Sequence, residues 1–370
     1  MTHGRCFCFA GGGTGGHIYP AIAVAEQIAK LQPDAKIKFF ISSRNVDRQI
    51  LDKTGFDYTV LPALGFSLAP HRLFKFFSAF LKSYKIAKSM LLAENAPVVV
   101  GIGGFVAAPV CYAAHRLNVP LGLLNIDFVP GRANKIIGQW ANRIFVQFEE
   151  TAPYFSGSKA QVSVTGCPLR STFAHLQPEK AVVELGLDKR KKILLVTGGS
   201  SGAENINEAV CMLLDKLDAF ADRWQLVHLT GPANLEKIKG AYAGAEITHC
   251  VLGYYDDMPN LLAAADLVIG RSGGVSVAEY AAAQAPSICM PYPYHKDQHQ
   301  YLNAGKLVEG GTAVIVDDLA DAKERAEWLW EELQILLIND QQRQEMKDAC
   351  ALIAKKDAAS EIAKLLIGEQ

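Results

Sequence analysis

Two segments of the chain repeat one local pattern, and this repeat constrains the fold more than any other feature. A short apolar run at residues 6–10 leads into a glycine-rich stretch at 11–16 and then into a helical pattern at 20–30. The same order returns later in the chain, at 192–196, 197–202 and 205–217. Because a strand, a glycine-rich turn and a helix open a Rossmann-type domain, the sequence predicts two such domains.

Apolar strands alternate with helical stretches after each repeat, at residues 37–42, 98–101 and 121–125 and again at 225–230, 267–270 and 287–290. This alternation predicts parallel sheets covered by helices on both faces. Pro178, Gly186 and a charge-rich run interrupt the pattern between the two halves. We therefore predict an α/β protein of two Rossmann-like domains facing a cleft, with boundaries at 1–168 and 169–340. A terminal helix at 341–370 is expected to pack back on the first domain.

Composition excludes several classes of protein. A chain of 370 residues exceeds what one core usually organises. A net charge of −1 argues against a nucleic-acid partner. The eight cysteines are scattered and form no C-x-x-C pair, which favours buried thiols in a reducing cytoplasm over disulfides or zinc.

No secretory signal or membrane span is expected. The longest uncharged stretch, residues 96–114, approaches the length of a span. It contains two prolines and three glycines, however, so we interpret it as a buried strand, a glycine turn and the start of a helix.

The first glycine turn has features of a phosphate site. Gly11-x-Gly13-x-x-Gly16 fits the dinucleotide fingerprint, and a helix N-terminus attracts anions. A tight turn without a ligand is the alternative. The second strand ends at Arg44 and has no acid for the ribose of NAD, but an arginine could accept the extra phosphate of NADP. An NADP-dependent oxidoreductase therefore stays a rival hypothesis.

His17 follows this turn at the N-terminus of the expected helix. A helix N-terminus lowers the pKa of a histidine and keeps the imidazole neutral, so His17 could accept a proton near pH 7. A histidine that only hydrogen-bonds the loop is the alternative.

A third strand–turn–helix segment carries the strongest binding signal. The strand at 267–270 leads into Arg271-Ser272-Gly273-Gly274 and a helix that contains Glu279. Glycines at a helix N-terminus suit a phosphate, and the carboxylate could accept bonds from both hydroxyls of a ribose. The polar residues 291–300 follow the next strand, where histidines and carboxamides suit sugar hydroxyls. An ordinary surface glutamate and a solvated loop are the alternatives.

Metal and nucleotide-triphosphate motifs are missing from the sequence. It has no Asp-x-Asp for a Mg²⁺–diphosphate and no P-loop. We therefore expect neither a metal nor a cofactor.

Residues 58–93 contain no acid and read as a basic amphipathic helix from Arg72 onward. Phe74 and Leu81 widen its apolar side beyond what burial against one sheet requires. Such a helix suits the surface of an anionic bilayer, although a core-packing helix with a solvated basic face is equally consistent. The residues that we assign to the membrane surface are Arg72, Lys75, Phe76, Phe77, Phe80, Lys82 and Lys85.

Taken together, these motifs resemble the MurG family of lipid-linked N-acetylglucosaminyltransferases. The resemblance runs in order from about residue 8 to 315. It rests on Gly12-Gly13-Thr14-Gly15-Gly16-His17-x-x-Pro20, Gly103-Gly104-Phe105, Gly131-x-x-Asn134-Lys135, Gly166-x-Pro168-x-Arg170, Gly198-Gly199-Ser200-x-Gly202-Ala203, Asp256-Asp257-Met258, Arg271-Ser272-Gly273, Glu279 and His295-Lys296-Asp297…Gln300-x-x-Asn303-Ala304.

The resemblance implies a GT-B fold and an inverting, metal-independent transfer in peptidoglycan and cell-wall synthesis, and hence in cell shape and division. The donor would be UDP-N-acetylglucosamine. The acceptor would be the 4-hydroxyl of the muramoyl sugar of lipid I, which gives lipid II at the cytoplasmic face of the membrane. The donor contacts that it implies are Thr14, Gly15 and Gly16 in the first loop, Arg170 and Ser200 near the diphosphate, Tyr255 at the uracil, Gly274, Val275, Ser276, Val277 and Ala278 at the phosphate, Glu279 at the ribose, and Gln300 at the sugar.

The chain departs from the family pattern at three places. Leu124-Asn125-Ile126-Asp127 stands where the family has His-Glu-Gln-Asn, Phe105 replaces a tyrosine, and Glu204 replaces an arginine. A paralogue with a different lipid-linked acceptor is therefore an alternative. We predict His17 as the catalytic base and Asp127 as the runner-up, because an exposed aspartate with a pKa of about 4 is a weak base. We expect Asp127 to accept hydrogen bonds from the sugar hydroxyls.

Overall fold

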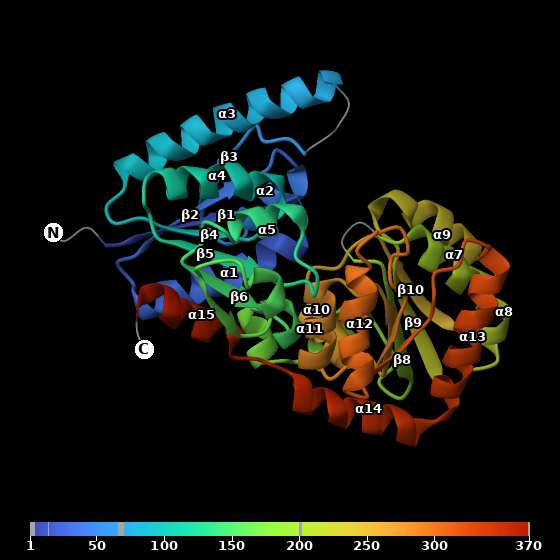
Figure 1. The fold of residues 1–370 in the computed structure, drawn as a ribbon. Coiled ribbons are helices and arrows are strands. Elements are labelled where there is room, and N and C mark those ends of the chain that lie inside the picture. The colour runs from blue at the N-terminus through green and yellow to red at the C-terminus, as the bar shows by residue number, and fades with distance from the viewer. Residues whose placement is uncertain (1–3, 14, 66–69, 200–201, 369–370) are drawn as a thin grey trace. The chain divides into compact units, whose positions relative to one another are not determined.

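The strands of the described residues join in two parallel sheets, one in each of two units of the chain (Figure 1). The structure, a computed structural model, describes residues 4–13, 15–65, 70–199 and 202–368. Unit 1 comprises Met1–Ser171 and Lys355–Gln370, and unit 2 comprises Thr172–Ala354. The predicted class, an α/β protein with two Rossmann-like domains, is confirmed.

The described part of unit 1 holds a seven-stranded sheet in the order β3-β2-β1-β4-β5-β6-β7. The order reverses between β1 and β4, and this reversal is the position where doubly wound sheets bind ligands. The strands are β1 (Cys6–Ala10), β2 (Lys36–Ile41), β3 (Asp57–Val60), β4 (Val98–Gly101), β5 (Leu121–Asn125), β6 (Arg143–Val146) and β7 (Gln161–Val164). The helices are α1 (Gly15–Leu31), α2 (Asn45–Leu51), α3 (Pro70–Ala93), α4 (Gly104–Arg116), α5 (Arg132–Ile137), the 3-10 helices η1 (Glu149–Phe155) and η2 (Ser171–Ala174, which runs into unit 2), and α15 (Ala358–Ile367).

Unit 2 repeats this plan in its described residues with six strands in the order β10-β9-β8-β11-β12-β13, which reverses between β8 and β11. The strands are β8 (Lys192–Thr197), β9 (Trp224–Leu229), β10 (Thr248–Leu252), β11 (Leu267–Gly270), β12 (Ser287–Cys289) and β13 (Ala313–Ile315). The helices are α6 (Pro178–Glu184), α7 (Glu204–Met212), α8 (Leu214–Asp218), η3 (Pro232–Asn234), α9 (Leu235–Ala241), α10 (Met258–Ala264), α11 (Gly274–Ala282), α12 (His299–Glu309), α13 (Ala322–Ile338) and α14 (Asp340–Ile353).

The central strands are buried along their whole length, as strands covered on both faces must be. Every residue of β1, β4, β5 and β11 is buried. This is why these strands appear in the sequence as continuous apolar runs. The stretch 96–114 forms β4 and α4, as its prolines and glycines predict.

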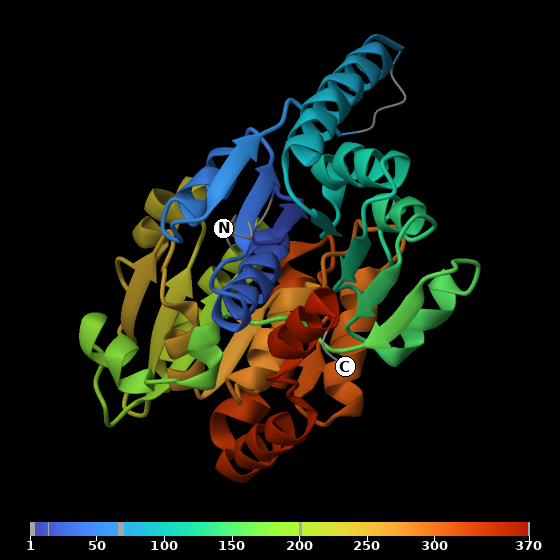
Figure 2. The same ribbon diagram turned by 90° about the vertical axis from the view of Figure 1, so that its left-hand side faces the viewer.

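The end of the chain differs from the single helix that the sequence suggests. Two helices form there: α14 belongs to unit 2, and α15 belongs to unit 1. α15 packs on α1, as Figures 1 and 2 both show. Its buried side chains Ile362, Ala363 and Leu366 join the core that contains Phe7 and Phe9.

The cysteines are free thiols, six of them buried and two partly exposed. Cys6 and Cys8 lie on the same side of β1, with their sulfur atoms 3.8 Å apart. Buried thiols of this kind agree with the interpretation of the cysteines as core residues.

Candidate active site

The glycine turn between β1 and α1 folds around a buried carboxylate. Both oxygens of Asp47, from α2, accept a hydrogen bond from the backbone N–H of Gly13 at 2.9 Å, and Oδ2 also accepts the Ser42 N–H at 3.2 Å. Gly12 and Gly13 have positive φ angles of 147° and 98°, and a Cβ at Gly12 would collide with Asp47. Glycine is therefore required here for the close approach of the acid.

Arg44 completes this turn from the other side. Its Nη1 donates to the carbonyl of Gly13 at 2.6 Å, and its guanidinium lies 6.0 Å from the ring centre of Phe105. Arg44, which from the sequence could have bound the extra phosphate of NADP, thus binds the protein backbone instead. A phosphate at Gly13 would also meet the charge of Asp47, which repels it.

His17 lies in the first turn of α1 and is only partly exposed. Loss of solvent lowers the pKa of His17, while the negative charges of Asp127 and Asp47 oppose this shift. A pKa below the usual histidine value keeps the ring neutral at pH 7 and able to accept a proton.

The segment that carries Asp127 is held by two asparagines. Asn125, buried at the end of β5, donates from Nδ2 to the carbonyl of Asp127 at 2.7 Å. Its Oδ1 accepts a hydrogen bond from Nδ2 of Asn134 on α5 at 2.9 Å. Gly103, with φ of 111°, passes so close to Asn134 that a Cβ there would lie 2.9 Å from Oδ1. This segment, which departs from the family pattern, is therefore well ordered by buried contacts.

Arg170 belongs to unit 1, although the sequence places it in the second domain. Its guanidinium lies 4.4 Å from the ring centre of Tyr19 on α1. This cation–π contact fixes the arginine against the helix that begins at the first glycine turn. Thr14, Ser200 and the side chain of Arg72 lie outside the part of the chain that the structure describes.

In unit 2, the turn after β8 also depends on glycine. A Cβ at Gly198 would collide with the backbone of Ala203, and a Cβ at Gly202 would collide with the carbonyl of Thr230. Gly202 has a φ of 78°. The turn therefore brings the start of α7 close to the end of the neighbouring strand β9.

The turn after β11 leads into α11, which begins after Gly273. The first-turn N–H groups of a helix have no intrahelical acceptor and favour an anion. The hydroxyl of Tyr280 donates to the carbonyl of Arg271 at 2.9 Å and ties α11 to this turn. Glu279 is partly exposed on the second turn of the helix.

Hydrogen bonds join the polar segment 291–303 to the turn after β11. Ser272 Oγ donates to the carbonyl of Gln300 at 2.8 Å, and Asn303 Nδ2 donates to the carbonyl of Ser272 at 3.0 Å. Gln300 Oε1 accepts the backbone N–H of Tyr292 at 3.0 Å. The structure thus brings together the two segments that the sequence singled out for the phosphate and the sugar.

Tyr255 lies apart from these segments in the strand order. It follows β10, the outermost strand of the sheet, and its hydroxyl donates to Glu184 of α6 at 2.8 Å. Burial, with this carboxylate as the second cause, raises the pKa of Tyr255 above its usual value. The hydroxyl is thus used within unit 2.

Helix α3 packs along α4 (Figure 1). It also exposes a strip of apolar side chains. Phe80 and Tyr84 contact Tyr112 of α4, with ring centres 6.1 and 5.5 Å apart. Phe76 and Phe80 are only partly exposed. The strongly exposed residues are Phe74 (78%), Phe77 (54%) and Leu81 (56%), beside the exposed Lys75, Lys82 and Lys85.

Among the described residues, no helix combines the length and the hydropathy needed to cross a membrane.

Comparison with known proteins assigns the chain to a family. Residues 7–146 match the glycosyltransferase family 28 N-terminal domain, and residues 193–362 match the C-terminal domain. The UDP-N-acetylglucosamine--N-acetylmuramyl-(pentapeptide) pyrophosphoryl-undecaprenol N-acetylglucosamine transferase of Alkaliphilus metalliredigens is 34% identical over 94% of this chain and 95% of its own. The chain belongs to this family of transferases. The oxidoreductase alternative is therefore wrong.

Solved structures agree on the fold. The crystal structure of Acinetobacter baumannii MurG is 25% identical, covers 98% of this chain and 99% of its own, and has a TM-score of 0.71. A putative UDP-N-acetylglucosamine 2-epimerase from Listeria monocytogenes has a TM-score of 0.73 at 16% identity, with 98% of this chain and 95% of its own covered. The epimerase shares the fold, and at this low identity the likeness says nothing about the activity of the chain.

Sequence reasoning missed Asp47. The residue lies in a short polar segment after β2, where an aspartate ordinarily faces solvent. The glycines at 12 and 13 were the one available signal, because their positive φ angles accommodate the carboxylate.

Proposed function

We propose that this chain transfers N-acetylglucosamine from UDP-N-acetylglucosamine to the 4-hydroxyl of the muramoyl sugar of undecaprenyl-pyrophosphoryl-muramoyl peptide. The observation that carries the proposal is the identity of 32–34% to transferases of that name over nearly their whole length. The reversal of strand order in both sheets adds support, because each unit then offers a position for one substrate.

The donor binds to unit 2 in this proposal. The N-terminal turn of α11, Gly274 to Ala278, takes the diphosphate, and Glu279 accepts hydrogen bonds from the ribose hydroxyls. Gln300 contacts the sugar, which its link to Tyr292 supports. Tyr255 flanks the uracil. The turn Thr14–Gly16 contacts the donor, and Arg170 with Ser200 serves the departing phosphate, so that helix N-termini and an arginine stabilise UDP as it leaves.

The proton of the acceptor is taken by His17. The 4-hydroxyl oxygen forms a bond to the anomeric carbon from the face opposite UDP, and the bond from that carbon to the phosphate oxygen breaks. The hydroxyl proton passes to the neutral imidazole, and the electron pair leaves with UDP, which inverts the anomeric centre. Asp127 accepts hydrogen bonds from sugar hydroxyls beside the base.

A different lipid-linked acceptor is the second candidate, and the segment Leu124–Asp127 favours it. The family's histidine and glutamate are replaced there, and buried contacts of Asn125 hold the new arrangement. A muramoyl acceptor with a changed peptide or lipid fits such a change while the donor residues stay the same.

The exposed strip on α3 supports reversible attachment to the cytoplasmic face of an anionic membrane. Phe74, Phe77 and Leu81 would enter the headgroup region, and Lys75, Lys82 and Lys85 would meet the anionic lipids. Attachment at this helix brings the enzyme to a lipid-linked acceptor.

The decisive experiment supplies radiolabelled UDP-N-acetylglucosamine with lipid I in anionic vesicles, with and without EDTA. We expect label in the lipid fraction in proportion to released UDP, at the same rate with the chelator. UDP release without labelled lipid, or conversion of the donor to its epimer, would overturn the proposal. Transfer to a muramoyl lipid with another peptide, but not to lipid I, would select the second candidate.

A further inference from the structure

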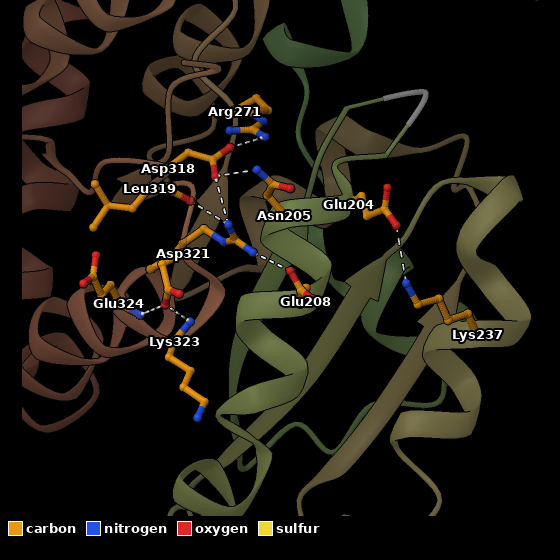
Figure 3. Close-up of polar contacts among 11 residues, drawn as sticks. Glu204, Asn205, Glu208, Lys237, Arg271, Asp318, Leu319, Asp321, Lys323 and Glu324 are labelled. Atoms are coloured by element: carbon orange, nitrogen blue, oxygen red, sulfur yellow. Dashed lines mark hydrogen bonds and ion pairs between the residues drawn. The ribbon is translucent and has the colours of Figure 1, made fainter. Parts of the chain in front are cut away.

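A cluster of charged side chains surrounds the buried Asp318 at the carboxyl edge of the sheet in unit 2 (Figure 3). Asp318 follows β13, and its side chain is fully buried. Its Oδ2 forms an ion pair with Nη2 of Arg271 at 2.7 Å, and its Oδ1 accepts a hydrogen bond from Nδ2 of Asn205 at 2.8 Å. One carboxylate thus joins β11, α7 and the segment after β13.

Arg325 of α13 balances the charges of this cluster. Its Nη1 lies 3.7 Å from Oδ1 of Asp318 and donates to the carbonyl of Leu319 at 2.7 Å, while its Nη2 pairs with Glu208 of α7. Two arginines face two carboxylates. Glu208 is half exposed, so the buried part of this group is Asp318 with its two arginines, and loss of the Asp318 charge would leave buried guanidinium charges uncompensated.

The cluster lies where the strand order of unit 2 reverses. Asn205 is the second residue of α7, after the turn that follows β8, and Arg271 directly follows β11. β8 and β11 are neighbours, and the crevice at such a reversal is the ligand site of doubly wound sheets. Asp318 therefore connects the two loops that form the walls of this crevice.

Arg271 extends the connection to the polar segment. Its Nη1 donates to the carbonyl of Met290 at 2.8 Å, and its guanidinium lies 5.6 Å from the ring centre of Tyr292. Tyr292 in turn donates its N–H to Gln300. The guanidinium thus determines where the segment 291–300 leaves the sheet.

We propose that Asp318 is a positioning residue of the nucleotide-sugar site, acting through Arg271 and Asn205 and not by contact with the ligand. The inference rests on the proposed function, because it takes the ligand of this crevice to be the donor. A fully buried carboxylate cannot reach that ligand itself, so its loss acts on affinity by loosening both walls.

The test replaces Asp318 by asparagine, which keeps the size of the side chain and removes its charge. We expect the Kd for UDP and the KM for UDP-N-acetylglucosamine to rise about tenfold, since a charged contact becomes a neutral one, with kcat changed less than about threefold. Amides of residues 291–303 should exchange hydrogen faster in the variant, a change that a merely destabilised α13 would not cause.

Two matched controls separate positioning from stability. Asp321→Ala, in the same segment, removes the cap whose Oδ1 accepts the N–H groups of Lys323 and Glu324 at 2.9 and 3.0 Å. Glu208→Gln weakens the partner of Arg325 and leaves the pair of Asp318 with Arg271. Both variants should keep the parent Kd for UDP even where they melt earlier.

If Asp318→Asn does not fold, Asn205→Ala tests the same link through one weaker contact, with an expected rise of about threefold in Kd. The inference is overturned if folded Asp318→Asn keeps both the Kd and the hydrogen-exchange rates of the parent. If only Asn205→Ala folds, the same result in that variant overturns the inference. A parent protein that binds UDP but transfers no sugar defeats the proposed transfer alone, and calorimetry and exchange still decide the role of Asp318. A parent that does not bind UDP defeats both.

Discussion

The two Rossmann-like units place a buried acid differently at their ligand edges. In unit 1, Asp47 binds the backbone N–H of Gly13 within the glycine turn itself. In unit 2, Asp318 binds the side chains of Arg271 and Asn205, and Arg325 lies beside it. Asp47 thus places a negative charge directly at the glycine turn of unit 1. In unit 2, arginines neutralise the charge of Asp318.

This difference separates the chemistry of two similar folds. A carboxylate on the amide of a turn competes with a phosphate for that amide, so the turn of unit 1 suits proton transfer by the neighbouring His17 and a neutral sugar hydroxyl. In unit 2 the N-terminus of α11 keeps its attraction for an anion. In the proposed assignment, the position of one acid, and not the backbone pattern, distinguishes the two roles. If this is correct, variants in unit 1 change turnover or acceptor binding, and variants in unit 2 change donor affinity.

The largest effect is expected from His17→Ala. Loss of the base should lower kcat by about 10²–10⁴-fold, while the Kd for UDP, measured by calorimetry, stays close to the parent value. Asp127→Asn is the companion variant and should lose less activity. A kcat lost in Asp127→Asn and retained in His17→Ala would make Asp127 the base.

The next effect concerns the acceptor side of unit 1. Replacement of Lys75, Lys82 and Lys85 by glutamine should weaken binding to anionic vesicles by about fivefold per charge, roughly 1 kcal/mol each, and less at high salt. The same change at Lys216, Lys239 and Lys347, exposed lysines of unit 2, is the matched control and should retain vesicle binding. If the α3 variant sediments with anionic vesicles as well as the parent does, α3 does not bind the membrane.

Glu279→Gln tests the donor side. Two charge-assisted hydrogen bonds become neutral ones, so the Kd for UDP should rise. The corresponding loss in the free energy of binding is roughly 1–3 kcal/mol. The parent should lose affinity for 2′-deoxy-UDP, and the variant should lose little more, because its ribose contact is already weakened. Equal losses in the two proteins would mean that the carboxylate does not bind the ribose.

The smallest effect is a change in pH dependence. The base must be neutral, so kcat/KM falls as the pH drops through the pKa of His17, which burial holds below the usual histidine value. Asp47→Asn removes one of the two charges that oppose this lowering, so the acidic limb should move to lower pH. Asp52→Asn, an exposed aspartate just after α2, is the control and should leave the limb in place. A limb that moves to higher pH in Asp47→Asn would contradict the assignment.

The sequence predicts the buried strands well and the contacts between distant residues poorly. β4, β5 and β11 begin and end as expected, because a strand buried on both faces reads as an unbroken apolar run. Asp47 binds a residue 34 positions away, and Asp318 binds one 113 positions away, so no local spacing marks either acid.

Two further differences have the same origin. Helix α3 is apolar on more than one side, so the side that packs is decided by Tyr112 of α4 and not by the helix itself. The terminal stretch keeps an amphipathic pattern through residues 354–357, where the structure separates α14 from α15. Helical periodicity reports which residues are apolar, and it does not report which partner covers them.

The return of α15 to unit 1 also affects the order in which the chain can mature during translation. Unit 2 is continuous and is complete once residue 354 has left the ribosome, whereas unit 1 waits for Ile362, Ala363 and Leu366 to cover its core. The half that is synthesised first is therefore finished last. Until then, the core that contains Phe7 and Phe9 lacks the three apolar side chains of α15.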